Sequence, residues 1–261
     1  MTVFLDLPAR DQAVGEEFWR RVTGSELSAR RGPDGAFVTL LPARGDACLR
    51  VQRVDDGPGG RHLDLHVDLS EESLDAVAAR SVGLGATVRH VEEGLVVLDS
   101  PGGFGFCLVV WEGEETVPEP VDLDGGGVGR LDQLCLDVPP EQFEAEVAFW
   151  SELTGWKRRS GSRPEFTALE RPAGLPIRVL LQRRSEAPAG DRVTAHVDFA
   201  GDDIDALAER HVAAGARIIA RQSHWVTLTD PTGQPYCLTG RDPRTGLLPP
   251  SSGEPRSDVS S

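Results

Sequence analysis

Apolar residues recur along the chain at two spacings. Recurrence at every second residue predicts short strands, and recurrence at every third or fourth residue predicts a few amphipathic helices. In residues 11–23, Val14, Phe18 and Val22 fall on one face of a helix, because four positions separate them. A second helix is predicted at residues 70–85, with Ser70 as its cap. Strands are predicted at residues 3–7, 35–43, 47–54, 62–68, 86–92, 94–100 and 105–111. The order of these elements predicts two βαβββ modules in succession.

The same pattern returns in the second half of the chain, which predicts an internal duplication. Residues 5–24 align without gaps on residues 136–155, and both segments share Leu-Asp, Phe-Trp and Thr-Gly pairs. The tripeptide His-Val-Asp begins at His66 and again at His196, with similar residues following in each copy. We therefore expect two tandem copies of one unit, with His66 equivalent to His196.

Composition divides the chain into two folded domains, a linker and a tail. Residues 112–127 are acidic and rich in Pro and Gly, which is typical of a linker. Residues 241–261 have the Pro, Ser and Gly bias of a disordered tail. The first domain is thus expected at residues 1–111 and the second at residues 128–240.

The charge of the chain argues against several classes of partner. Its formal net charge is −15 over 261 residues, which would repel nucleic acid and anionic membranes. It contains no apolar run of about 18 residues, and its N-terminus has no basic segment followed by an apolar one. We expect a cytoplasmic protein. The four cysteines are isolated from one another, which predicts buried free thiols.

These motifs together resemble the vicinal oxygen chelate superfamily, and in particular the glyoxalase-like and bleomycin-resistance-like domains that occur in tandem in bacteria. The resemblance rests on Phe-Trp and Thr-Gly in the first helix, His-Val-Asp on a later strand, and Asp-Pro-x-Gly-x-x-x-Cys-Leu from Asp230. It implies an α+β fold with two tandem domains. In each, a pair of βαβββ modules forms a curved sheet around a cavity.

In the metal-dependent members of this superfamily, the first and last strands of each module supply the ligands of one divalent ion. The positions that the resemblance matches are Thr2, a residue near Arg50, His62 and Cys107, and then Gln133, a residue in 176–183, Arg192 and Cys237. Arginine cannot bind a cation, so the set is incomplete and we expect no metal cofactor. If a divalent metal binds, His62 and Cys107 are the candidate ligands, and Asp64 is close enough to share an ion with His62.

The histidine-bearing strands suggest a second kind of chemistry. Alternate residues of a strand share one face, so His62, Asp64 and His66 lie together, and the resemblance implies that this face lines the cavity. His66 and His196 recur in both copies and are the candidate catalytic acid–base residues. The candidate ligand-binding residues are His62, Asp64, Arg192, Thr194, His224 and Trp225. The alternative is that both recurring histidines are structural. Asp68 and Asp198 are expected to cap the following loop.

Three functions remain open from the sequence. The leading hypothesis is a metal-free protein that binds a small apolar or aromatic molecule, either to sequester it or to convert it by acid–base chemistry. The first alternative is a divalent-metal-dependent lyase, isomerase or dioxygenase. The second is a non-catalytic sensor or scaffold. In each case we expect a monomer with pseudo-dimeric domain packing or a homodimer.

Overall fold

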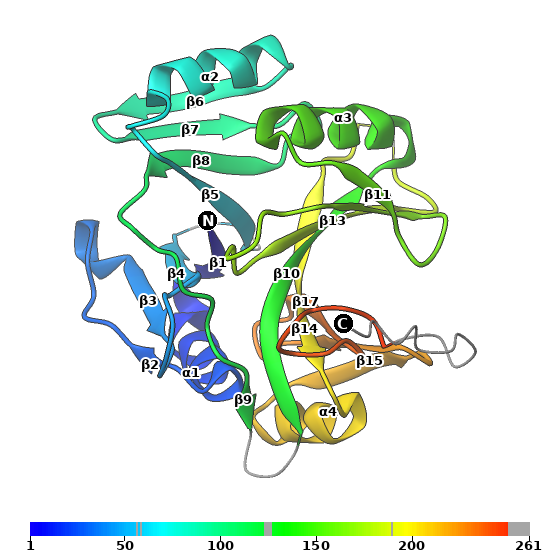
Figure 1. The fold of residues 1–261 in the computed structure, drawn as a ribbon. Coiled ribbons are helices and arrows are strands. Elements are labelled where there is room, and N and C mark those ends of the chain that lie inside the picture. The colour runs from blue at the N-terminus through cyan, green and yellow to red at the C-terminus, as the bar shows by residue number, and fades with distance from the viewer. Residues whose placement is uncertain (56, 58, 123–126, 189, 250–261) are drawn as a thin grey trace, which may run out of the picture.

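The computed structural model describes residues 1–55, 57, 59–122, 127–188 and 190–249, and its strands form two large curved sheets (Figure 1). In the first sheet the order is β2-β3-β4-β1-β5-β8-β7-β6, and in the second it is β11-β12-β13-β10-β14-β17-β16-β15. The first sheet contains β1 (Thr2–Pro8), β2 (Glu26–Leu27), β3 (Phe37–Leu41), β4 (Leu49–Val54), β5 (Gly60–Val67), β6 (Thr87–Glu92), β7 (Leu95–Asp99) and β8 (Gly105–Val110). The predicted α+β fold of two duplicated modules per domain is confirmed.

The second sheet repeats this plan. It contains β10 (Val128–Val138), β11 (Arg158–Ser160), β12 (Phe166–Leu169), β13 (Arg178–Arg183), β14 (Thr194–Gly201), β15 (Arg217–Arg221), β16 (Trp225–Thr229) and β17 (Pro235–Thr239), and the short β9 (Val121–Asp122) pairs with β10. Each sheet is joined at its centre by an antiparallel pair of first strands, β1 with β5 and β10 with β14. The side chains of these two central pairs therefore meet in the middle of each sheet.

Among the described residues, four α-helices cover the sheets: α1 (Gln12–Thr23), α2 (Leu74–Gly83), α3 (Phe143–Thr154) and α4 (Ile204–Ala213); the 3-10 turns are η1 (Ala9–Asp11), η2 (Pro33–Gly35) and η3 (Pro140–Gln142). The prediction that Ser70 caps the second helix is wrong. The N-cap of α2 is Ser73, whose side chain accepts a hydrogen bond from the Ala76 backbone. Ser70 instead belongs to a turn in which it donates to Asp68, so the helix begins later.

The predicted equivalence of His66 and His196 is also wrong. In the first sheet His62 lies opposite Phe4, and in the second His196 lies opposite Cys135, the residue equivalent to Phe4. The offset along β5 and β14 is therefore 134 residues, whereas it is 131 between β1 and β10, and 130 between β4 and β13 and between α2 and α4. Relative to the first copy, the segment before β14 is therefore four residues longer and the segment after it is four residues shorter. His196 is equivalent to His62, and not to His66.

The first helix of each copy packs against the second module of the other copy. The rings of Phe18 and Trp19 in α1 contact Tyr236 in β17, at centroid distances of 5.9 and 5.4 Å. In α3, Phe149 and Trp150 contact Phe106 of β8 at 5.8 and 5.3 Å, and Figure 1 shows α3 beside β8 and α2. Trp19 and Trp150 are fully buried. The two copies thus form one interlocked body.

The segments after each sheet pack against it. Glu115 and Thr116 of the predicted linker donate hydrogen bonds from their backbone N–H groups to Asp46 of the first copy. In the predicted tail, Arg241 is 6% exposed and forms an ion pair with the buried Asp132 at 2.7 Å. Residues 241–249 therefore belong to the folded protein, and 250–261 lie outside the described residues. In the part of the chain that the structure covers, no helix is long and apolar enough to span a membrane.

Candidate functional site

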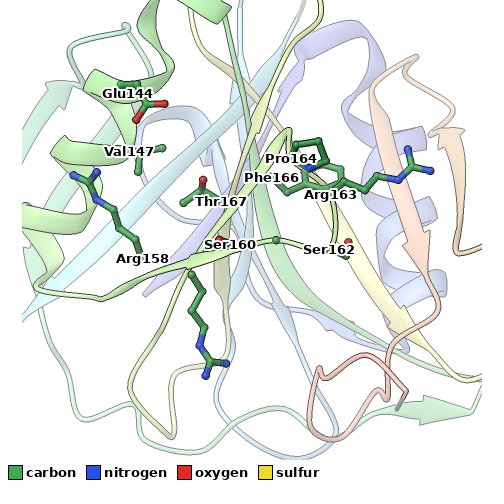
Figure 2. A pocket seen from close by; sticks show the side chains of 11 residues that line it. Glu144, Val147, Arg158, Ser160, Ser162, Arg163, Pro164, Phe166 and Thr167 are labelled. Carbon is green, nitrogen blue, oxygen red and sulfur yellow. The ribbon is translucent and has the colours of Figure 1, made fainter. Parts of the chain in front are cut away.

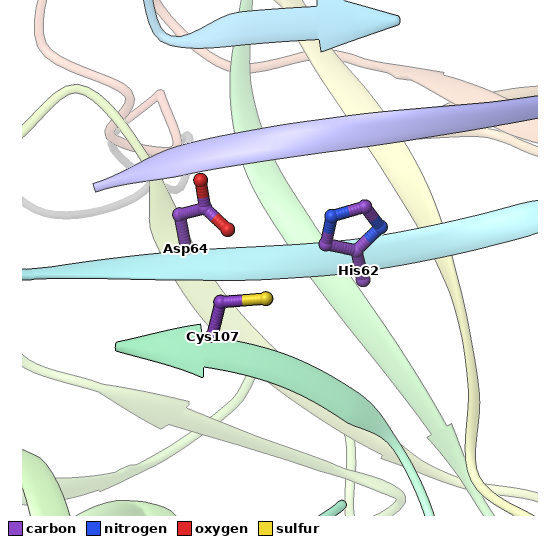
Figure 3. Close-up of side chains that lie close together, drawn as sticks. All are labelled: His62, Asp64 and Cys107. Carbon is purple, nitrogen blue, oxygen red and sulfur yellow. The ribbon is translucent and has the colours of Figure 1, made fainter. Parts of the chain in front are cut away.

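Three side chains with metal-binding or acid–base chemistry meet at the centre of the first sheet. His62 and Asp64 project from β5 and Cys107 projects from the neighbouring β8 (Figure 3). Their ligand atoms all lie within 4.8 Å of one another. We call these three residues the first cluster. It unites the predicted candidates His62, Asp64 and Cys107 in one place.

His62 is held by two residues of β1. Its Nδ1 lies 2.9 Å from Oδ2 of Asp6, and its ring stacks on Phe4 with 4.3 Å between centroids. Burial opposes the charge of the ring, but Asp6 and then Asp64 raise the pKa of His62 above its usual value. Burial raises the pKa of Asp64, while His62 and Arg50 act against this shift.

The second sheet carries a matching constellation, the second cluster, made of Cys135, His196 and Asp198. Nδ1 of His196 lies 2.7 Å from Oδ2 of Asp137, and Nε2 lies 3.4 Å from Oδ1 of Asp198. Gln133 donates its amide N–H to the other oxygen of Asp198. The carboxylate–histidine–carboxylate arrangement is therefore the same in both copies, but the cysteine comes from β8 in the first and from β10 in the second.

Two carboxylates control the protonation of His196. Burial disfavours the imidazolium, but the carboxylates of Asp137 and Asp198 raise the pKa of His196 well above its usual value. Burial raises the pKa of Cys135 to about 12, so the thiol is protonated at neutral pH when no cation is bound. The two carboxylates thus favour a positive charge between them. In the metal-free protein, the proton on His196 supplies this charge.

The residues of the second cluster fit a divalent cation. Oδ1 of Asp198 is buried and has no hydrogen-bond partner among the described residues, and it faces Nε2 of His196. Imidazole, carboxylate and thiolate are donors for zinc and related first-row metals, and a histidine whose other nitrogen binds a carboxylate is typical of such sites. The first cluster fits less well, because the guanidinium of Arg50 lies 3.8 Å from Asp64 and competes for its charge.

His66, a predicted catalytic residue, lies outside the first cluster. Its Nε2 is 3.0 Å from the hydroxyl of Thr2, and its Nδ1 is 3.1 Å from Oε1 of Glu114, in the predicted linker. Burial lowers the pKa of His66 to about 4, so the ring is neutral at physiological pH. The structural equivalent of His66 in β14 is Ala200, which carries no polar side chain.

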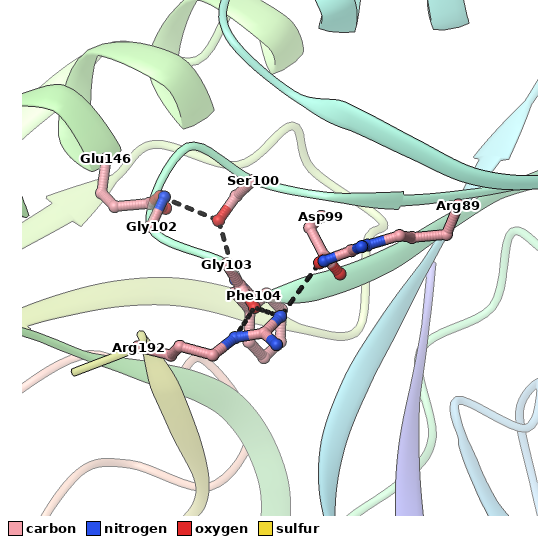
Figure 4. Close-up of polar contacts among 8 residues, drawn as sticks. All are labelled: Arg89, Asp99, Ser100, Gly102, Gly103, Phe104, Glu146 and Arg192. Atoms are coloured by element: carbon pink, nitrogen blue, oxygen red, sulfur yellow. Dashed lines mark hydrogen bonds and ion pairs between the residues drawn. The ribbon is translucent and has the colours of Figure 1, made fainter. Parts of the chain in front are cut away.

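The other predicted ligand-binding residues are dispersed. Arg192 lies before β14 and contacts the first copy, where it donates to Gly103 O and pairs with Asp99 at 2.9 Å (Figure 4). Thr194 is exposed at the start of β14, opposite Asp137. His224 is exposed, and the half-buried ring of Trp225 lies 4.7 Å from the guanidinium of Arg163. Only Thr194 shares the strand of His196.

The expectation for the two strand aspartates is half right. Asp68 caps a turn by accepting from the backbone and hydroxyl of Ser70. Asp198 instead lies inside β14 and belongs to the second cluster, because the strand extends four residues further there. The sequence reasoning assigned no role to Asp6 and Asp137. The signal was present in the shared Leu-Asp pair of the two first strands, which the repeat places at equivalent positions.

A separate hollow of about 450 Å³ is lined by other residues than those of the two clusters (Figure 2). Glu144 and Val147 of α3 form one wall, and the turn between β11 and β12 forms the other. Three exposed arginines line it, Arg158, Arg159 and Arg163. Two of them are paired with carboxylates, Arg159 with Glu170 at 2.5 Å and Arg163 with Glu165 at 3.6 Å. In this open hollow, carboxylates therefore neutralise two of the three arginines.

Sequence comparison matches both copies to one family. A family model described as a glyoxalase-like domain matches residues 2–109 and 133–239. Two proteins from Mycobacterium sp. strains JLS and MCS, both named peptide deformylase, are 32% identical over 137 residues, which is 45% of this chain and 64% of theirs. The alignment thus spans slightly less than two thirds of these relatives.

Comparison of folds finds vicinal oxygen chelate proteins over nearly the whole chain. The 2,3-dioxygenase LapB from Pseudomonas sp. KL28 has a TM-score of 0.61 at 16% identity, with 97% of this chain and 94% of that chain covered. The Mn(II)-bound glyoxalase from Novosphingobium aromaticivorans has a TM-score of 0.61 at 16% identity, with 100% and 90% covered. At these identities the likeness concerns the fold. With the match of both copies to the family model, the chain belongs to the glyoxalase-like domain family of the vicinal oxygen chelate superfamily.

Proposed function

We propose that this protein is a divalent-metal-dependent enzyme that acts on a small molecule, with its reaction centre at the second cluster. The observation that carries the proposal is the pair formed by Nε2 of His196 and Oδ1 of Asp198. These atoms lie 3.4 Å apart, and the oxygen lacks a hydrogen-bond partner within the described chain. Cys135 adds a third donor. This replaces the metal-free hypothesis as the leading one.

The residues around the cluster prepare it for a cation. Asp137 accepts from Nδ1 of His196 and so directs Nε2 toward Asp198. Gln133 holds the other oxygen of Asp198, which fixes the rotation of the carboxylate. A bound divalent ion would act as a Lewis acid on an oxygen of the substrate. The fold neighbours include dioxygenases and a glyoxalase, which supports a lyase, isomerase or dioxygenase reaction.

A metal-free function is the second candidate, and the charge of His196 favours it. The imidazolium lies between Asp137 and Asp198, so the cluster is already electrically satisfied by one proton. Such a group donates a proton to one atom of a bound molecule without a metal, and the neighbouring carboxylate accepts a proton from another atom of that molecule. In this case the protein sequesters a small ligand or converts it by acid–base chemistry.

Metal content separates the two candidates. Untagged protein would be treated with chelator, soaked in Zn²⁺, Ni²⁺, Fe²⁺ or Mn²⁺, desalted and measured by elemental mass spectrometry. We expect about one equivalent of metal in the wild type, loss in His196→Ala, and retention in His224→Ala, which changes an exposed histidine. Loss in His62→Ala but not in His196→Ala would move the centre to the first cluster. No bound metal under any condition would leave the metal-free candidate.

A further inference from the structure

Four arginines gather around one buried carboxylate beside the second cluster. Asp132 is fully buried and stands at an irregularity of β10, where the register with β14 shifts between Leu131 and Gln133. Arg241 binds its two oxygens at 3.0 and 2.7 Å. The other three arginines, Arg130, Arg171 and Arg178, also interact electrostatically with Asp132. We call Arg130, Arg171, Arg178 and Arg241 the arginine cluster.

Several N–H groups of the arginine cluster are buried without a partner. Arg178 donates to the carbonyl of Gly246, and Arg130 donates through Nη1 to the carbonyl of Pro118 at 3.4 Å. Nε and Nη2 of Arg130 and Nη1 of Arg171 make no hydrogen bond to any described residue. Arg130 is only 7% exposed, so bulk water does not satisfy these donors. A buried charged donor that lacks an acceptor is costly.

The positive charge in this region exceeds the local negative charge. Asp132 neutralises one of the four guanidiniums. Burial, together with repulsion from Arg130, Arg178 and Arg241, lowers the pKa of Arg171 to about 10, although Asp132 acts in the opposite direction. The whole chain carries a net charge of −15, so such a concentration of arginine is not a general property of its composition.

The nearby carboxylates are engaged elsewhere. Asp198 faces the second cluster, where Gln133 binds one of its oxygens and Nε2 of His196 lies 3.4 Å from the other. Asp242 accepts from the backbone N–H groups of Arg244 and Thr245 in the turn that follows. Glu119 is 62% exposed and pairs with Arg44 at 3.8 Å. None of these three therefore satisfies the free donors of Arg130 and Arg171.

A small cavity of about 50 Å³ lies beside Arg130 at the boundary of the two copies. Cys48 of the first copy, Pro118 of the linker and Phe199 of β14 are among the residues that line it. This volume accommodates an ion of a few atoms or one end group of a larger molecule. Guanidinium groups bind planar carboxylates and phosphates with paired hydrogen bonds.

We propose that the arginine cluster is a binding site for a small oxyanion, either free or as the phosphate or carboxylate group of a larger ligand. The anion accepts hydrogen bonds from the free donors of Arg130 beside the cavity, and its charge offsets the repulsion among the four guanidiniums. The site does not require a metal at the second cluster. The hollow near Arg158 differs, because its arginines are exposed and largely paired.

Calorimetric titration with inorganic phosphate and with acetate tests the proposal on the full chain, treated with chelator and kept at constant ionic strength. We expect at least one anion to bind, and Arg130→Gln and Arg171→Gln each to weaken its affinity by about tenfold or more. Arg158→Gln is the matched control and should leave the affinity unchanged. Binding of phosphate alone or acetate alone identifies the group preferred. Equal heats with chloride, or full affinity in both cluster variants, would overturn the site.

Thermal unfolding adds a readout that a merely structural role would not give. In chloride buffer, Arg171→Gln should unfold at the same temperature as the wild type or higher, because it removes a repelled charge. In the binding anion, the wild type should gain several degrees while Arg171→Gln gains little. If Arg171→Gln is instead less stable than the wild type in chloride, the arginines serve to hold the fold and the proposal fails.

Discussion

The indole N–H of Trp19 in α1 donates a 3.1 Å hydrogen bond to Asp230, which stands 211 residues later in the turn before β17. In the other half of the molecule the carboxylate comes from the helix and not from the turn. Trp150 donates to Glu146 on its own helix, and Glu146 accepts from Ser100 and from the Gly102 backbone in the equivalent turn (Figure 4). Each buried tryptophan thus binds one carboxylate, supplied by the turn in one half and by the helix in the other.

Removing either indole donor should destabilise the fold. Trp19→Phe leaves an oxygen of the buried Asp230 without its closest donor, and Trp150→Phe does the same to Glu146. We expect each change to lower the free energy of unfolding by about 1–3 kcal/mol, measured by urea denaturation. Trp156→Phe is the control, since its half-buried indole donates no hydrogen bond in the described part of the chain. Equal losses in all three variants would assign the effect to ring size alone.

The equivalent of Glu146 in α1 is Gly15, where the helix approaches its neighbours closely. A Cβ atom there would lie 2.5 Å from Cδ1 of Leu7 and 3.0 Å from the Thr232 side chain of the second copy. Gly15→Ala should therefore cost about 1–3 kcal/mol through overpacking, despite its better helix propensity. Gly83→Ala in α2 meets nothing within 4 Å and should gain up to about 1 kcal/mol. A stabilised Gly15→Ala protein in thermal unfolding would refute the close contact.

His66 should make the protein sensitive to acid. Its pKa is about 4 in the folded chain, below the usual value of 6.5, because burial disfavours its charge. The unfolded chain therefore takes up a proton first, and the free energy of unfolding falls as pH drops from about 6.5 to 4. His66→Gln should remove about 2–3 kcal/mol of this loss. Urea denaturation at a series of pH values measures it, and an unchanged acid slope in the variant would contradict it.

His196 should act in the opposite direction. Its folded pKa is raised well above 6.5, so its stabilising charge is fully present below that pH and is lost as pH rises through the folded value. For metal-free protein, the free energy of unfolding should decline above pH 6.5 by at most about 1.4 kcal/mol per pH unit from this group. His196→Gln should flatten the decline and His224→Gln should not. A steep decline that persists in His196→Gln would exclude this charge as its source.

The alternation of apolar residues predicted the strands, because that pattern is local. The repeated motifs predicted the duplication. The equivalence of His62 and His196 was not visible, since the loops flanking β5 and β14 differ by compensating lengths and an identical tripeptide occurs at His66. A shift by four residues is even, so it preserves which face each side chain occupies. The partners Asp6 and Asp137 were missed because they reach the histidines across neighbouring strands, and only the pairing register brings them together.

The exchange of helices between the copies has a consequence for any shortened chain. Residues 1–111 alone would expose Phe18 and Trp19, whose partners Phe199 and Tyr236 lie in the second copy. Two such half-chains would bury these rings only by forming a dimer in which the first helix of each packs against the other. A single-copy ancestor of this protein would accordingly have folded fully only as a dimer. Gene fusion would have linked the two copies covalently and allowed their sequences to diverge independently.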